Sequence, residues 1–172
     1  MWIKGLEHLR GVLFVLGTKV TTMKEPQTKL GKQLSKILDR QGNEFSLVSS
    51  GNEYDTFQLE ISDNQIMNLI CHDYLELAYG ILIDTKSSYP LSSKVTPAAL
   101  VKAINRANLK STSVITVAEL QDEAFILHFK TFVHLEKRMR FTSLLDEAME
   151  LHLQEIDEVI SPHFKNIDKE KK

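Results

Sequence analysis

Histidine is the first residue type to test for chemistry, because imidazole is the commonest metal ligand and general base in proteins. His128 and His134 occupy one face of a predicted strand, but six residues of strand separate them by about 20 Å, too far to share an ion. His152 lies in the apolar stripe of a predicted helix, where Ala148 and Ile156 offer no second ligand. Since no HExxH or HxxxH spacing occurs, the sequence predicts no metal site.

Nucleophilic catalysis is equally weakly indicated. Cys71 and His72 are adjacent in a predicted strand and therefore point to opposite faces, which disfavours a Cys–His dyad. GxSxG, GxGxxG and P-loop motifs do not occur in the sequence. We therefore expect no enzyme, no catalytic residue and no cofactor. The alternative is a small-ligand-binding protein or enzyme with a dispersed site, for which the candidate residues are His72, Asp73, His128 and Glu136.

The composition is that of an ordinary globular protein, with 172 residues, 42% of them hydrophobic and 26% charged. The 21 basic and 23 acidic residues give a net charge of −2, which argues against binding nucleic acid or a membrane surface through bulk charge. A basic cluster at 137–140 is interpreted as a solvated loop, because the helix after it is acidic. A single cysteine excludes an internal disulfide, and the predicted localisation is cytoplasmic.

Three parts of the chain differ in composition. Residues 1–22 form an apolar N-terminal extension, 23–163 a single α+β domain, and 164–172 a charged tail that we expect to be disordered. The extension contains too few apolar residues for a membrane span, which needs about 20. Its leucine spacing permits a short amphipathic helix. Two alternatives stay open: translation starts at Met23, or the extension anchors the domain at a membrane.

Hydrophobic periodicity predicts the elements that must position the candidate residues. Helices are predicted over 27–41, 96–108 and 142–160, and strands over 45–49, 54–61, 65–72, 77–84, 112–119 and 123–134. Gly42 ends the first helix, and Thr96-Pro97 opens the second. Residues 86–94 (KSSYPLSSK) are a predicted polar loop.

Short turns between strands favour an antiparallel sheet. The predicted fold class is therefore α+β, an antiparallel sheet with helices packed on it, in the order α-β-β-β(-β)-α-β-β-α. The second helix is expected to bury Leu100, Val101 and Ile104.

The predicted strands carry apolar side chains on both faces. Leu82, Ile126 and Phe132 occupy the face opposite the expected core, whereas a sheet covered on one side should have one polar face. Either helices cover both faces, or the second face binds a partner. On the second alternative, Leu82, Ile126 and Phe132 are the candidate partner-binding residues.

Residues 100–117 (LVKAINRANLKSTSVITV) carry Asn105 and Asn108 near a helix end, just before a strand, and a later strand leads into Phe-Thr-Ser-Leu-Leu at 141–145. Over about 27–160 this pattern resembles the YbjN-type bacterial proteins, which share the fold of type III secretion chaperones. The resemblance implies a small, commonly dimeric protein that binds an extended segment of a client protein. On this basis we expect a protein-binding homodimer in a regulatory or chaperone role, with a protein partner, no nucleic acid and no membrane span.

Overall fold

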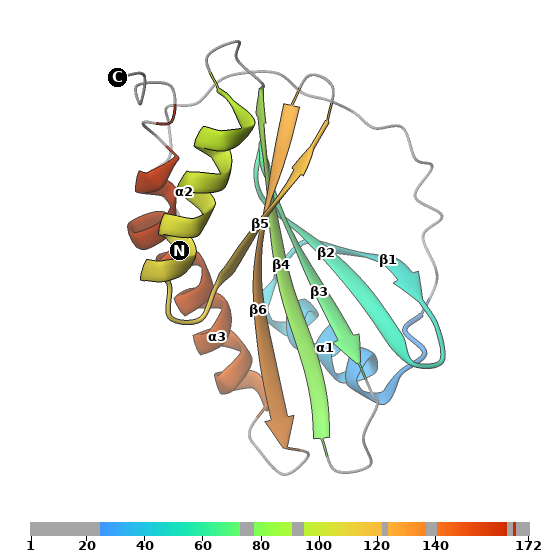
Figure 1. Ribbon diagram of the computed structural model, residues 1–172. Coiled ribbons are helices and arrows are strands. Elements are labelled where there is room, and N and C mark those ends of the chain that lie inside the picture. Colours follow the sequence, from blue (N-terminus) through green and yellow to red (C-terminus); the bar gives the residue numbers. More distant parts are fainter. Residues whose placement is uncertain are drawn as a thin grey trace.

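The computed structural model describes residues 25–72, 78–90, 95–121, 124–136, 141–164 and 167. Three helices and six strands follow one another in the order α-β-β-β-β-α-β-β-α, which confirms the predicted α+β class (Figure 1). The predicted extension 1–22 and the basic cluster 137–140 lie outside the described residues. Within the described ranges, no helix has the length and apolar character needed to cross a bilayer.

The strands form one sheet in the order β1-β2-β3-β4-β6-β5, and every neighbouring pair is antiparallel. β4 and β6 are neighbours at the centre although α2 and β5 lie between them in the sequence. The strands are β1 Phe45–Ser50, β2 Tyr54–Ser62, β3 Gln65–His72, β4 Ala78–Pro90, β5 Ile115–Leu120 and β6 Ala124–Glu136.

β4 is longer than the sequence predicts. It pairs with β6 along all 13 of its residues, so the predicted polar loop at 86–94 is wrong as far as Pro90. Ser87 is buried, and the Tyr89 ring stacks on Phe125 with 5.2 Å between ring centroids. Polar residues can therefore fill the inward positions of a strand, and a hydrophobic pattern does not detect them.

Helix α1 (Lys29–Gln41) confirms the first predicted helix. The Thr28 hydroxyl accepts a hydrogen bond from the Gly31 N–H (2.9 Å) and so satisfies an amide of the first turn. Gly42 ends the helix with φ 71°, the left-handed conformation that glycine adopts without steric cost.

A buried carboxylate fixes the start of α1 to β2. Asp55 accepts hydrogen bonds from the backbone amides of Gln27 (3.1 Å) and Thr28 (2.8 Å). The hydroxyls of Thr28 and Ser50 each donate to the same carboxylate over 2.5 Å. The contact is close enough that a Cβ atom on Gly31 would lie 2.1 Å from Asp55 Oδ2. Asp55 therefore sets the position of α1 on the sheet.

Helix α2 (Pro97–Lys110) begins as predicted at Thr96, whose hydroxyl accepts a hydrogen bond from the Ala99 N–H (3.2 Å). Its buried residues are Leu100, Ala103 and Ala107. Val101, predicted to be buried, is 55% exposed, because it points away from the side that these three residues define. Val101 lies about one third of a turn around the helix axis from the middle of the buried side, so the prediction that it is buried was wrong.

Helix α3 (Phe141–Glu155) continues into a π turn (Ile156–Ile160) and a 3₁₀ turn (Ser161–His163). Phe164 and Ile167 follow and are buried against α2 and β6. The prediction of a disordered tail from residue 164 is therefore wrong at these two positions, where apolar side chains close the second core.

Two hydrophobic clusters lie between the helices and one face of the sheet. The first joins α1 and α3 to β1–β4, with Leu34, Phe57 and Ile83 among its buried members. The second joins α2 and the end of α3 to β6, with Leu100 and Phe129 among its buried members. In Figure 1, α1 lies behind β2 and β3, while α2 and α3 lie beside β4, β5 and β6. All three described helices therefore cover the same face, and the expectation of helices on both faces is not met within the described residues.

Candidate functional site

The open face is the face of the sheet turned away from the three helices, and its side chains come from alternate positions of β2–β6. Ile70, Leu82 and Phe132 lie there as register partners on β3, β4 and β6 and form what we call the apolar row. Phe132 is 54% exposed, whereas Ile70 and Leu82 are half-buried. Directly opposed side chains are about 5 Å apart, so the apolar row is a continuous strip across three strands.

β5 extends this apolar character to the edge of the sheet. Ile115 is 62% exposed and pairs with Lys130, the neighbour of Phe132 on the open face. Val117 is also exposed and pairs with His128. Ile70, Ile115 and Val117 are not among the predicted partner-binding residues, because only the register of the strands places them on the same face as Leu82 and Phe132.

The structure separates the three predicted partner-binding residues. Leu82 and Phe132 are direct register partners. Ile126 is half-buried and pairs with Ser88 and Glu119, six residues and about 20 Å further along β6. Leu82 and Phe132 therefore belong to one surface, and Ile126 lies outside it.

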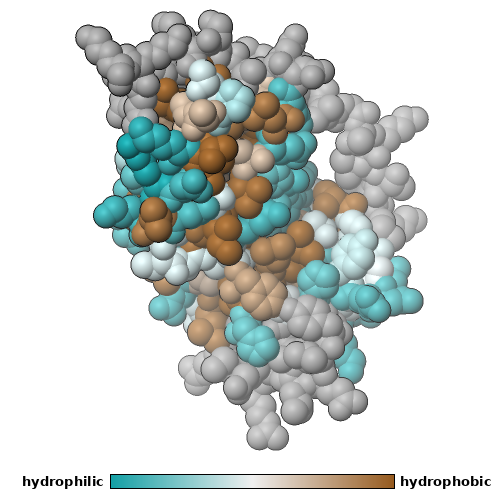
Figure 2. All heavy atoms as spheres, viewed as in Figure 1, coloured by the Kyte–Doolittle hydropathy of each residue, from teal (hydrophilic) through white to brown (hydrophobic). Residues whose placement is uncertain are grey.

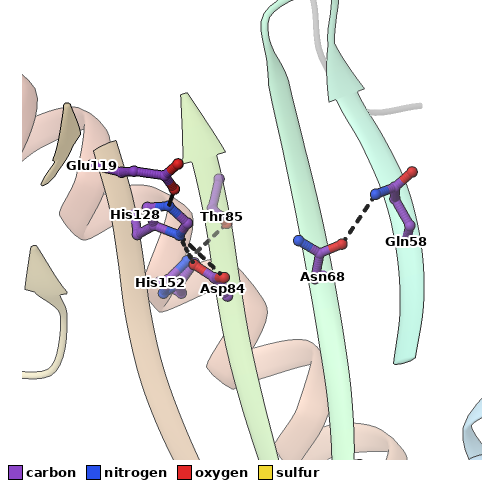
Figure 3. A network of polar contacts seen from close by, with 7 residues as sticks. All are labelled: Gln58, Asn68, Asp84, Thr85, Glu119, His128 and His152. Atoms are coloured by element: carbon purple, nitrogen blue, oxygen red, sulfur yellow. Dashed lines mark hydrogen bonds and ion pairs between the residues drawn. The ribbon is translucent and has the colours of Figure 1, made fainter. Parts of the chain in front are cut away.

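Beside the apolar row, the open face carries a group of polar side chains that we call the polar band (Figure 3). It consists of Gln58, Asn68, Asp84, Glu119 and His128. The His128 ring lies between two carboxylates, with Nδ1 3.2 Å from Asp84 Oδ1 and Nε2 3.4 Å from Glu119 Oε2. A hydrogen bond from Gln121 and then one from His128 lower the pKa of Glu119. Three strands, β4, β6 and β5, are joined through this one imidazole.

The same band continues onto β3 and β2. The Gln58 amide donates to Asn68 Oδ1 over 3.2 Å (Figure 3). Asn68 and Asp84 are register partners and are both buried. A polar surface therefore flanks the apolar row on one side, a pattern suited to orienting a bound segment.

Of the dispersed candidate residues named from the sequence, His72 and His128 do not converge in the structure. His72 packs against Tyr54, with ring centroids 6.0 Å apart, at the end of β3. His72 and His134 share a row of the sheet, and His128 lies six residues, about 20 Å, away along β6. Glu136 lies two residues beyond His134 and Asp73 lies outside the described residues. Across the part of the chain that the structure covers, no three His, Cys, Asp or Glu side chains are grouped to bind a metal ion.

His152 is a packing residue, as its position in the apolar stripe predicts. Its ring is fully buried, with Nε2 2.9 Å from the Thr85 hydroxyl and Nδ1 2.8 Å from the Thr131 hydroxyl. Burial lowers the pKa of His152 to about 4, against a smaller opposing effect of the Glu155 carboxylate. The neutral imidazole thus connects α3 to both central strands.

Cys71 is buried in the first cluster, as expected for a small hydrophobic side chain. Burial, and then the negative charge of Asp55, raise the pKa of the thiol above its ordinary value. The thiolate that nucleophilic chemistry requires is therefore disfavoured at neutral pH.

The outer side of α2 is a second apolar surface. A shallow hollow of about 530 Å³ lies over Pro97, Ala98, Val101, Lys102, Asn105, Arg106 and Leu109. Leu109 is 84% exposed, one helical turn further along α2 than Asn105 and two turns beyond Val101. Figure 2 shows hydrophobic side chains interspersed with hydrophilic ones over this helix.

No family model and no curated protein match the chain. Among solved structures it matches the crystal structure of YbjN, a proposed transcription regulator from E. coli. The two chains are 17% identical, the match covers 74% of this chain and 86% of that one, and the TM-score is 0.49.

Proposed function

We propose that this chain is a non-enzymatic, cytoplasmic protein-binding module in a regulatory or chaperone role, and that its partner protein covers the apolar row. The observation that carries the proposal is the half-exposed phenyl ring of Phe132, set beside Leu82 and Ile70 on a sheet face that no described helix covers. Apolar rows of this kind are unfavourable in water and are typical of interaction surfaces.

The surroundings of the row indicate what a partner must provide. On one side the polar band offers the partly exposed side chains of Gln58 and His128, and on the edge strand Ile115 and Val117 extend the apolar area. An amphipathic segment fits this pattern, with apolar residues over the row and polar groups toward the band. We expect Phe132 to act as the anchor, because exposed aromatic residues dominate the energetics of such contacts.

Replacing Phe132 with lysine tests the proposal, with Leu151→Lys as the matched control. Both side chains are about half exposed, at 54% and 52%, but Leu151 lies on α3, away from the open face. In capture experiments from the native cell, we expect the wild-type protein and Leu151→Lys to retain the same partner and Phe132→Lys to bind it roughly thirtyfold more weakly. Equal retention by all three proteins, at unchanged circular dichroism, would contradict the proposal.

We also propose that the chain is a homodimer, joined through the outer side of α2. Val101 and Leu109 are exposed there beside a hollow, on a surface separate from the open face, so that a dimer leaves the apolar row accessible. A contact along the length of one helix suits antiparallel packing of two copies.

Light scattering across a range of concentrations tests the dimer. We expect the wild-type protein to have twice the mass of the 19.7 kDa chain and Leu109→Glu to have the mass of one chain. Leu151→Glu, which adds the same charge at an exposed position of α3, should leave the dimer intact. A wild-type protein of single-chain mass at every concentration rules the dimer out.

A further inference from the structure

β5 is an edge strand, and only one side of its backbone is paired with β6. In an antiparallel pair, the amides and carbonyls of alternate residues point to the partner strand, and those between them point outward. The Gln121 N–H donates to the Ala124 carbonyl over 2.8 Å, which places the odd-numbered residues on the β6 side. The groups of Val114, Thr116, Ala118 and Leu120 therefore point to the outer edge.

Two side chains from the end of α2 occupy the first part of this edge. The Asn108 amide donates to the Thr116 carbonyl (3.0 Å), and the Thr116 N–H donates to Asn108 Oδ1 (2.7 Å). The carboxamide thus makes the same pair of bonds that a neighbouring strand would make. Likewise, the Ser111 hydroxyl accepts from the Val114 N–H (3.0 Å) and lies 2.5 Å from the Val114 carbonyl oxygen.

The loop that carries Ser111 is itself held in place by α3. The Glu155 carboxylate accepts hydrogen bonds from the Ser111 hydroxyl (2.7 Å) and from the backbone amides of Thr112 and Ser113. Desolvation would raise the pKa of Glu155, but these hydrogen bonds outweigh it and lower the pKa to about 2. The carboxylate is therefore charged at neutral pH and keeps Ser111 against the edge.

The sequence of β5 offers little other protection against pairing with itself. Ile115–Leu120 (ITVAEL) contains no lysine and no proline, the residues that commonly blunt edge strands. Two copies related by a two-fold axis at Val117 would place Thr116 opposite Ala118 of the second copy, and Val114 opposite Leu120 of the second copy. Glu119 would then face Ile115 of the second copy, so like charges do not oppose each other.

We propose that Asn108 and Ser111 close the β5 edge against a second copy of this chain. In the two-fold pairing, each pair of opposed residues contains one residue whose backbone groups are already bonded by Asn108 or Ser111. The two caps together therefore prevent every hydrogen-bonded pair of this arrangement from forming. The inference goes beyond the proposed function, since it concerns neither the apolar row nor the outer side of α2. It also gives Asn108, one of the two asparagines near the end of α2, a specific task.

Removing the two caps should leave the outward backbone groups of Val114 and Thr116 available to pair with a second copy. We expect Asn108→Ala combined with Ser111→Ala to raise the mass of the wild-type particle at least twofold at high concentration, by light scattering, because each chain gains one free edge. At low concentration the amides of Val114 and Thr116 should exchange their hydrogens about tenfold faster than in the wild-type protein. At high concentration they should be protected again, together with Ala118 and Leu120. Asn52→Ala, an exposed asparagine in the turn before β2, is the matched control and should change neither quantity.

The single variant Asn108→Ala gives the same test if the double variant unfolds, because it alone frees Thr116 to pair with Ala118 of a second copy. Folded cap variants that keep the wild-type mass at all concentrations overturn the proposal. The results expected for the cap variants do not depend on whether Leu109→Glu loses the α2 dimer or whether Phe132→Lys loses partner binding. The edge proposal can therefore be contradicted without contradicting the proposed function, and the reverse is also true.

Discussion

Asp55→Ala is expected to destabilise the fold by about 3–5 kcal/mol, a large part of the stability of a domain of this size. The substitution leaves the buried amide of Thr28 and the amide of the more exposed Gln27 without their acceptor, and it removes the partner of two hydroxyl groups. It also removes the negative charge from the N-terminal end of α1, where the helix dipole favours one. Urea denaturation followed by circular dichroism measures the loss.

The exposed Asp63 in the turn between β2 and β3 provides the matched control, and Asp63→Ala should change stability by less than about 0.5 kcal/mol. Gly31→Ala tests the same contact from the helix side, because the added methyl group overlaps the Asp55 carboxylate and must displace it. Stability within 1 kcal/mol of wild type for Asp55→Ala (roughly one ordinary hydrogen bond) would show that α1 is positioned by its apolar residues alone.

Lowering the pH from 7 to 4 is expected to cost the folded state about 3 kcal/mol through His152 alone. Burial lowers the pKa of His152 to about 4 in the folded protein, whereas the ordinary pKa of a histidine side chain is about 6.5. Between these two values the unfolded chain binds more protons, so stability is complete above pH 6.5 and falls as the pH falls toward 4. Urea denaturation at a series of pH values measures the slope.

His152→Gln should flatten this slope, because glutamine retains hydrogen-bonding groups for Thr85 and Thr131 but does not titrate. His134→Gln, at an exposed position of β6, is the matched variant that also removes one imidazole, against which the effect of His152→Gln is compared. Glu155, with its pKa lowered to about 2, adds a further and smaller loss only below about pH 4.5, since its side chain is only half-buried and solvent screens its charge. A slope unchanged by His152→Gln would assign the pH dependence to other groups.

Local signals in the sequence predicted the elements that carry their own stop and start residues. Gly42 and the Thr96-Pro97 pair define ends of α1 and α2 that the structure confirms, because capping depends on residues within one turn. The strand alternation likewise placed Leu82 and Phe132 on one face. Ile126 could not be separated from them without the register of β6 against its neighbours.

Contacts between distant parts of the chain could not be predicted in this way. Asp55 lies 27 residues from Thr28, and nothing in either segment indicates that one caps the other. Asn108 is an ordinary residue near a helix end until β5 is placed beside it. The strand at residues 86–90 was missed because its inward positions are polar and its pairing with β6 depends on residues 124–128.

The pairing of β4 with β6 also has a consequence for how the chain folds. β1–β4 pair in sequence order, as do β5 and β6, so two units can form from local contacts. The 13-residue pairing of β4 with β6 joins them and must close the intervening segment that contains α2 and β5. Loop closure of this length slows folding. We therefore expect the pairing of β4 with β6 to be the rate-limiting step of folding. The units β1–β4 and β5–β6 should form before it.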